Sequence, residues 1–462
     1  MKLNELSAAA LLEGFAARTF SPVEVMRDVI ARVEACEPRI HATYLFAPER
    51  ALAEAQAATA RWAKGEPKGA LDGVPATLKD NIATRGEPKP VGTAASELTP
   101  SPVDAPPAAR LREAGAIVFA KTTMPDYGML SSGLSSFHAL ARNPWDVSRN
   151  PGGSSAGAGA AGAAGYGPLH LGTDIGGSVR LPASWCGLFG LKPSAGRVPI
   201  DPPYIGRVAG PLTRTVDDAA LMMATLSLPD TRDYMSLPPE KLDWRVAPAK
   251  LKGVRIGLVA EIGCGQRPDP QVRQAIERAG RDFAAAGAIV EPVGPFFRQE
   301  MLDGLDLFWR MRSMMDIDAL PPSKRDKVLP YIRAWAESAR GLSGETVFSG
   351  FGRIQEFAAL AVKATSPFDF LISPTAPMTA YAADWASPSE DPLNPFPHIG
   401  FTVAFNMSGQ PAASINAGFD ARGLPIGLQI VGKRFDDLGV LALARAYEEI
   451  RSAPMLAWPS PS

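Results

Sequence analysis

The sequence predicts an α/β fold, and two observations carry this prediction. A capped amphipathic helix followed by a glycine and a short apolar strand occurs twice, over residues 104–120 and again over residues 269–290. Further strand-like segments occur at Val254–Ala260, Phe370–Ile372 and Ile426–Val431. Helices that alternate with apolar strands in this way are typical of α/β proteins.

The first of these units has a recognisable start and stop. Asp104 can cap a helix that runs from Pro106 to Ala114, and Gly115 ends it before the apolar strand 116–120. A proline just inside the start and a glycine just past the end are the usual helix boundaries.

The second unit repeats the pattern. Asp269 is the expected N-cap, Pro270 occupies the first helical position, and Gly287 precedes the strand 288–290. Apolar residues recur at helical spacing and predict the buried face of this helix, which consists of Val272, Ile276, Ala279 and Phe283.

Helices are also expected at both ends of the chain. Residues 4–18 predict a short amphipathic helix, residues 21–24 form a capping box that starts a second one, and residues 48–64 predict a third. A last helix is expected over residues 436–450. Residues 226–253 are rich in Pro, Asp and Lys and predict a connection between two halves.

Composition and charge exclude several classes of protein. The net charge of −1 and the pI near 6.5 leave no basic footprint for nucleic acid. Three distant cysteines make a disulfide framework improbable and favour a reducing compartment. Glu5 and Glu13 interrupt any apolar signal-peptide core, and no window of eighteen residues is free of charge and apolar throughout. We therefore expect a cytoplasmic protein that binds neither nucleic acid nor membrane.

The most unusual segment is the glycine-rich stretch 151–194. Ten glycines fall between Gly152 and Gly177, and this density indicates backbone that must bend sharply or approach a ligand closely. The apolar continuation at residues 185–191 is not expected in a flexible linker. The stretch should therefore be ordered and functional.

Two general motifs overlap within this stretch, and neither fits its surroundings. Residues 153–157 match the GxSxG nucleophile elbow, but turn residues precede it where a strand is needed, and His398 is the only late histidine. Residues 157–162 match the GxGxxG dinucleotide fingerprint, but the strand is again missing and Asp174 follows too early. Since the four histidines are scattered and HExxH is absent, we expect no metal and no cofactor.

Histidine is scarce, so the base of any nucleophilic serine should be a lysine. No Ser-x-x-Lys spacing occurs in the chain, which means that such a lysine must come from elsewhere in the sequence. Lys79 follows the period-two apolar residues Val74, Ala76 and Leu78 and should lie at a strand end. A lysine in that place is most often a solvated surface charge.

Three motifs together resemble the amidase signature family of Ser-cis-Ser-Lys amide hydrolases. They are GVPATLKDN at residues 73–81, GGSSAG at residues 152–157 and LGTDIGGSVRLPASWCGLFGLKPS at residues 171–194. Shorter similar elements extend the resemblance to about residues 70–450, and these are KTTMPDYG, ARNPWD, GPLTRTVDDAALM, ISPTAPM and LPIGLQIVG. The resemblance implies one large domain with a twisted mixed β-sheet surrounded by helices, in which residues 1–65 form a helical segment packed on the catalytic domain 66–462.

The resemblance also implies roles for individual residues. It assigns Ser178 as the nucleophile, Ser155 as the bridging serine and Lys79 as the base. It further implies a cis peptide between Ser154 and Ser155, and here Ala156 departs from the family's usual glycine. The implied oxyanion hole consists of the backbone N–H groups of Ile175, Gly176, Gly177 and Ser178.

Physical chemistry agrees with these roles. A lysine with its reference pKa of about 10.4 is protonated at pH 7, so Lys79 must be buried to act as a base. Gly176 and Gly177 would let an oxyanion approach the backbone without obstruction. We also expect Asp174 and Arg180 to pair and to fix the loop that carries Ser178.

The substrate is less well defined by the sequence. Aromatic and methionine side chains crowd residues 296–315, where they could be core or pocket, and Met129, Leu130 and Tyr204 are candidate substrate-binding residues. These residues favour an aryl or alkyl amide, an anilide, a carbamate or an ester as the substrate.

The alternative is the glutamine-hydrolysing component of a tRNA-dependent amidotransferase, but residues 392–419 contain no acid that could bind the amino group of glutamine. The expected partner is a small-molecule amide, and a homodimer stays open.

Overall fold

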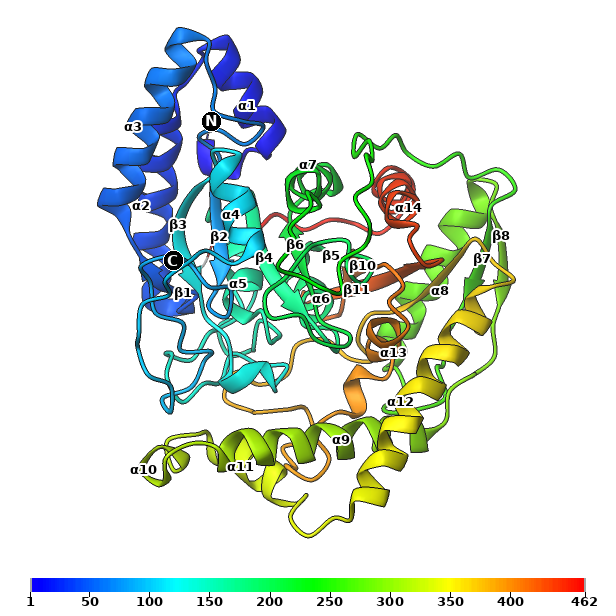
Figure 1. The fold of residues 1–462 in the computed structure, drawn as a ribbon. Helices are drawn as coiled ribbons and strands as arrows, with labels where there is room; N and C mark the ends of the chain where they lie inside the picture. Colours follow the sequence, from blue (N-terminus) through cyan, green and yellow to red (C-terminus); the bar gives the residue numbers. More distant parts are fainter. Residues whose placement is uncertain (1, 461–462) are drawn as a thin grey trace.

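A single sheet of eleven strands forms the centre of the protein (Figure 1). The computed structural model describes residues 2–460 of the 462. In chain order the strands are β1 (Thr43–Phe46), β2 (Pro75–Lys79), β3 (Ile117–Thr122), β4 (Leu169–Asp174), β5 (Phe189–Lys192), β6 (Val208–Thr213), β7 (Arg255–Leu258), β8 (Ile289–Pro292), β9 (Phe370–Pro374), β10 (Ala412–Phe419) and β11 (Pro425–Gly432).

Helices surround this sheet. In chain order the helices are η1 (Leu3–Glu5), α1 (Ala8–Ala17), α2 (Pro22–Ile40), α3 (Pro48–Lys64), α4 (Pro106–Glu113), η2 (Asp126–Gly128), α5 (Ala156–Ala164), α6 (Arg180–Cys186), α7 (Val216–Leu226), α8 (Pro270–Ala285), α9 (Gln299–Asp318), α10 (Pro322–Arg325), α11 (Pro330–Glu337), α12 (Gly344–Thr365), η3 (Pro397–Ile399), α13 (Val403–Met407) and α14 (Asp437–Ile450).

The sheet is mixed, with the strand order β1-β3-β2-β4-β6-β5-β10-β11-β9-β7-β8. Strand β2 pairs in parallel with β3 and β4, and β7 pairs in parallel with β8 and β9. The other neighbours are antiparallel, including the pair β5 and β10, which joins the first half of the chain to the second. The predicted fold class, a large mixed sheet surrounded by helices, is therefore confirmed.

Both predicted helix-strand units are present, as α4 followed by β3 and as α8 followed by β8. Their caps differ from the expectation. The N-cap of α4 is Ala105 rather than Asp104, whose carboxylate instead accepts the backbone N–H of Arg85 and pairs with Arg112. Asp269 is the N-cap of α8, but its side chain makes no capping hydrogen bond.

The N-terminal segment contributes a strand as well as helices. Ser7 caps α1, so the helix expected over residues 4–18 is divided into η1 and α1. The predicted capping box at Ser21 and Glu24 starts α2. Strand β1 then pairs with β3 at the edge of the sheet, and the first 65 residues are thereby part of the central sheet. The domain boundary expected at residue 65 stays a prediction.

The predicted connection between the two halves runs from the end of α7 to the start of β7 and contains no helix or strand. Beyond it, α9, α11 and α12 form a layer at the lower end of the sheet in Figure 1. The close crossing of α9 and α12 requires two glycines, because a Cβ on Gly350 would lie 2.7 Å from the carbonyl oxygen of Gly304. This layer closes one end of the sheet, where the predicted catalytic residues lie.

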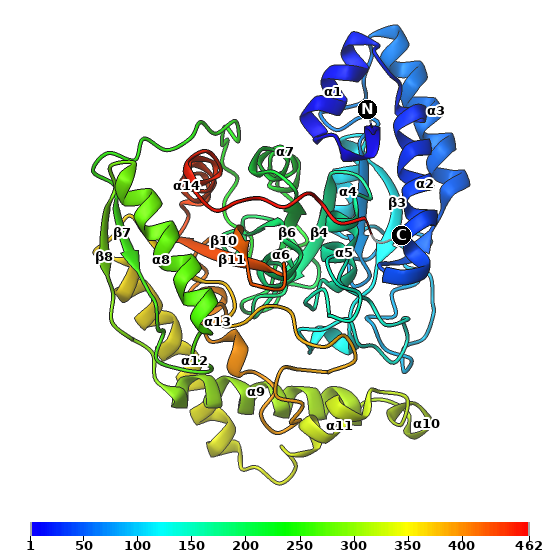
Figure 2. The same ribbon diagram turned by 180° about the vertical axis from the view of Figure 1, so that it is seen from behind.

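The end of the chain crosses the back of the molecule. In Figure 2 it runs from α14 towards α2 and α3. There Arg32 donates a hydrogen bond to the carbonyl oxygen of Pro459, and the guanidinium of Arg214 lies 4.4 Å from the ring centroid of Trp458. Within residues 2–460, no helix has the length and apolarity needed to cross a membrane.

Candidate active site

The glycine-rich stretch folds into the part of the sheet that the sequence analysis singled out. Ser155 immediately precedes α5, Asp174 ends β4, and Arg180 begins α6. Lys79 is the last residue of β2, which pairs in parallel with β4. Parallel neighbours end at the same edge of a sheet, and this brings Lys79 beside the segment that carries Ser178.

Lys79 is completely buried, as expected. Burial lowers its pKa to about 7, against the opposing effect of the Asp174 carboxylate and with a further lowering by the Arg207 guanidinium. Its Nζ lies 3.1 Å from Oγ1 of Thr173, which also accepts a hydrogen bond from Asn81. At pH 7 a large fraction of Lys79 is therefore neutral and able to accept a proton.

Two other lysines are also buried, but they contact no serine. Burial lowers the pKa of Lys192 to about 7, and its Nζ donates to the carbonyl oxygen of Pro193. Burial lowers the pKa of Lys121 to about 8, and its Nζ donates to Ile82 O and to Thr84 Oγ1. A lowered pKa alone would not identify Lys79, so its contacts decide.

The serine that contacts Lys79 is Ser154, not Ser155. Nζ of Lys79 lies 2.8 Å from Oγ of Ser154. The cis peptide precedes Ser154, between Gly153 and Ser154, one bond earlier than expected. On both counts the placement expected for Ser155 is wrong by one residue, because two adjacent serines in the sequence do not reveal which hydroxyl faces the lysine.

Ser155 has a different environment. Its Oγ donates to the carbonyl oxygen of Thr173 at 3.2 Å and accepts the backbone N–H of Thr173 at 3.3 Å. Its own backbone N–H donates to the carbonyl oxygen of Ser178 at 3.2 Å. Ser155 thus ties the start of α5 to β4 and to the segment of Ser178.

Asp174 and Arg180 form the expected pair, with 3.0 Å between Oδ1 and Nη2 and with both side chains fully buried. Burial would raise the pKa of Asp174, but the Arg180 guanidinium and the hydrogen bonds from Val179 N–H and Asn406 outweigh it and hold the pKa well below its usual range. The Asp174 carboxylate also accepts the N–H of Gly177 at 2.8 Å. This buried network fixes the loop from Asp174 to Arg180.

The same contact changes the expected oxyanion hole. The N–H of Gly177 is engaged with Asp174, so it is not a free donor. The N–H groups of Ile175, Gly176 and Ser178 have no hydrogen-bond partner among the described residues. These three donors are available to a ligand beside Ser178.

A narrow cavity of about 30 Å³ lies beside Ser178. Its walls come from four distant segments and are mostly apolar. A Cβ on Gly176 would lie 3.2 Å from the ring of Trp309, so the glycine keeps this space open. The lining residues are Gly128, Met129, Leu130, Ser131, Ile175, Gly176, Ser178, Trp309, Arg312, Phe396 and Ile399.

The candidate substrate residues are divided between this cavity and its surroundings. Met129 and Leu130 line the cavity, whereas Tyr204 lies outside it, against the guanidinium of Arg312. In the segment 296–315, Trp309 lines the cavity, but Phe297 and Met301 are buried in the core. Both alternatives for that segment are therefore realised.

Several contacts were missed by the sequence analysis. Asn81 lies two positions after Lys79 and therefore on the same side of an extended chain, a spacing that could have indicated it. Arg312 is a cation in an otherwise apolar, methionine-rich segment. Thr173, Phe396 and Ile399 carry no comparable signal in the sequence.

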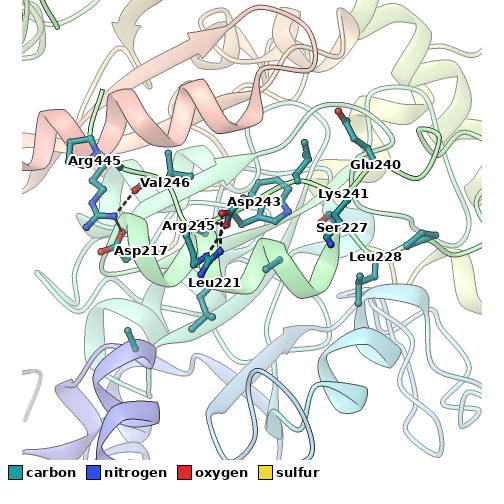
Figure 3. A pocket seen from close by; sticks show the side chains of 18 residues that line it. Asp217, Leu221, Ser227, Leu228, Glu240, Lys241, Asp243, Arg245, Val246 and Arg445 are labelled. Carbon is teal, nitrogen blue, oxygen red and sulfur yellow. Dashed lines mark hydrogen bonds and ion pairs between the residues drawn. The ribbon is translucent and has the colours of Figure 1, made fainter. Parts of the chain in front are cut away.

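A larger cavity of about 810 Å³ lies elsewhere, between α7, α14 and the connection 227–248 (Figure 3). Two ion pairs at its wall, Asp217 with Arg445 and Asp243 with Arg245, neutralise their charges mutually. None of the predicted catalytic residues lines it. In Figure 1, α7 and α14 lie at the end of the molecule opposite α9, so this cavity is separate from the candidate active site.

Residues 2–460 contain no group of three or more His, Cys, Asp or Glu side chains that could hold a metal ion. His398 is buried against Trp185, with neither ring nitrogen hydrogen-bonded within the described residues. Burial lowers its pKa to about 3.

Comparison with known proteins was made on this basis. The family model described as Amidase matches residues 24–441. The glutamyl-tRNA(Gln) amidotransferase component of this type from Gloeobacter violaceus is 34% identical over 487 aligned residues, which cover 96% of each chain. A bacterial aryl acylamidase of the amidase signature family has a TM-score of 0.88 at 30% identity over 96% of each chain. Peptide amidase from Stenotrophomonas maltophilia has a TM-score of 0.83 at 26% identity over 98% of each chain.

The large mixed sheet and the glycine-rich serine segment are thus those of the amidase signature enzymes, as the sequence motifs implied. The chain belongs to the amidase family. It is an amide hydrolase that acts on C–N bonds.

Burial of Lys79 predicts a measurable cost in stability. Its pKa falls from an ordinary value of 10.5 in the unfolded chain to about 7 in the folded one, so between these values the unfolded state binds more protons and this contribution to stability rises with pH. Lys79→Met removes the cost. We expect the variant to be more stable than the parent at pH 7, and we expect this advantage to shrink by about 2 kcal/mol at pH 9.

Urea-induced unfolding at the two pH values measures this difference. Lys64→Met is the matched control, because the Lys64 side chain at the end of α3 is exposed. An advantage of Lys79→Met that is absent at pH 7, or equal at both pH values, would contradict the lowered pKa.

Proposed function

We propose that the protein hydrolyses a carboxylic amide through an acyl-enzyme on Ser178, with Lys79 as the base and Ser154 as the bridging serine. The observation that carries this proposal is the 2.8 Å contact between Nζ of the buried Lys79 and Oγ of Ser154. Ser178 is 8% exposed and lines the cavity that a substrate would enter.

The reaction begins with a proton relay. Ser178 gives its hydroxyl proton to Ser154 as Ser154 gives its own proton to neutral Lys79, and Oγ of Ser178 attacks the amide carbon. The carbonyl oxygen becomes an oxyanion that accepts hydrogen bonds from the free N–H groups beside Ser178. The proton then returns through Ser154 to the amide nitrogen, the C–N bond breaks and the amine leaves. Water hydrolyses the acyl ester through the same relay and regenerates Ser178.

The cavity wall supports an aryl or alkyl amide as the substrate, with anilides, carbamates and esters as close variants. Trp309, Phe396 and Ile399 offer apolar contact to a ring or chain. The similarity to the bacterial aryl acylamidase, at 30% identity, agrees with this choice.

The second candidate is the glutamine-hydrolysing component of a tRNA-dependent amidotransferase, which would act with partner proteins. The name of the 34% identical relative favours it. Free glutamine carries an ammonium group, however, and the described residues that line the cavity include no Asp or Glu to bind it. A stand-alone amide hydrolase fits this cavity better.

Hydrolysis by the purified chain alone of glutamine, an aliphatic amide, an anilide and an aryl carbamate separates the two candidates. We expect turnover of the anilide or the carbamate, and none by Ser178→Ala. Turnover of glutamine only, or of no compound until partner proteins are added, would favour the amidotransferase.

The two adjacent serines give an internal control for the bridging role. Ser154→Ala removes the hydroxyl in contact with Lys79 and should lower kcat/KM for the anilide by about 10²–10⁴, the usual contribution of general acid–base catalysis. Ser155→Ala removes hydrogen bonds to Thr173 only and should cost less than about tenfold. Should Ser155→Ala be inactive and Ser154→Ala active, Ser155 would be the bridging serine after all.

A further inference from the structure

Two arginines share the face of one tyrosine at the edge of the candidate active site. Arg312 lies on α9, and Arg207 immediately precedes β6. The Arg312 guanidinium lies 5.2 Å from the ring centroid of Tyr204, and that of Arg207 lies 5.6 Å from it. The two cations are close enough that Arg312, after the larger effect of burial, lowers the pKa of Arg207.

Neither guanidinium has an anionic partner within residues 2–460. Nε of Arg312 is buried without a hydrogen bond, and the nearest acceptor of its Nη2 is the thioether sulfur of Met129 at 3.0 Å. A thioether is a weak acceptor. Arg207 donates only one long hydrogen bond, 3.4 Å, to the carbonyl oxygen of Pro202.

The acids nearby are committed elsewhere or face the solvent. On α9, Asp306 pairs with Arg310 and Asp318 pairs with Arg340. Asp316 on α9 and Asp201 in the loop before Tyr204 are exposed, and the described residues give neither an ion pair. The charges of Arg207 and Arg312 are therefore not balanced by the protein.

Other buried arginines of this protein are balanced. Arg180 pairs with Asp174, and Arg197 pairs with Asp437 and Glu240. Two adjacent cations with no counter-charge repel each other and are costly to keep out of water. Their presence beside the catalytic residues is accounted for if a ligand supplies the missing negative charge.

Both arginines are placed to contact a substrate. Arg312 lines the cavity that contains Ser178 and Gly176. Arg207 lines a second cavity, of about 220 Å³, together with Asn81 and Thr173, which is in contact with Lys79. Lys89 adds another cation to its wall. A carboxylate at Arg312 and Arg207 would thus lie at the edge of the reacting centre.

We propose that Arg312 and Arg207 bind a carboxylate of the substrate, so that the natural substrate is an amide bearing a negative charge. This inference rests on the proposed function, because it places the anion relative to Ser178. The substrate class is a monoamide of a dicarboxylic acid or an amide of a carboxylated amine. An amino acid zwitterion such as glutamine is a poorer fit, since the cavity offers no acid for its ammonium group.

Pairs of substrates that differ only in charge test the proposal. One pair carries the charge on the acyl part, the mono-4-nitroanilide of glutaric acid against the 4-nitroanilide of 5-methylhexanoic acid. The other carries it on the amine part, 4-acetamidobenzoate against 4-isopropylacetanilide. We expect the full-length protein to prefer the anion in one pair by at least about tenfold in kcat/KM, the effect of one hydrogen bond to a charged group. The pair that shows the preference identifies the charged side.

Arg312→Gln should bring that ratio close to one, and Arg298→Gln, at the exposed N-cap of the same helix, should leave it unchanged. Equal rates for anionic and neutral substrates in the parent would overturn the inference while leaving the proposed function intact. A preference that survives Arg312→Gln would also overturn it.

A binding measurement separates failure of the inference from failure of the proposed function. If the parent hydrolyses none of the four compounds, the proposed function fails, and calorimetric titration with glutarate then decides whether an anion site exists. Binding of glutarate that Arg312→Gln weakens at least about tenfold supports the site. No binding of glutarate, or binding equal in both proteins, rejects it.

Discussion

The burial of Lys79 is the constraint on which the rest of the site depends. Strand β2 lies between β3 and β4, and this interior position removes the amine at its end from water. A buried amine lowers its pKa by losing hydration, but a free carboxylate nearby would reverse the effect. Asp174 is such a carboxylate, and Arg180 compensates it within the same buried network. The pair that shapes the nucleophile loop thus also limits how far Asp174 favours the charged lysine.

The sheet joins segments that are far apart in the chain. Lys79 comes from β2, the serines flank α5 and α6, and the cavity wall adds α9 and the segment around η3. The antiparallel centre of the sheet holds the first half of the chain against the second. The fold therefore serves to bury one lysine, to hold a rigid loop of free N–H groups beside it, and to cover both with an apolar layer.

Local signals made much of this predictable. Proline and glycine marked the ends of α4 and α8, and the two serines and Lys79 stood within motifs that resemble a known family. The sequence could not show which of Ser154 and Ser155 faces Lys79, because that depends on the direction of one peptide plane. It could not show that Asp174 occupies the N–H of Gly177, since only the folded loop brings them together. Nor could it show that Arg312 has no partner, because that depends on where every acid lies.

Peptide mass spectrometry of the trapped intermediate tests the central claim most directly. The protein would be mixed with an activated 4-nitrophenyl ester, quenched with acid within the first turnover, and digested. The account predicts one acyl group, attached to Ser178, and none in Lys79→Met, because the serine is no longer activated. An acyl group on Ser154 or Ser155, or full turnover without any acylated serine, would contradict it.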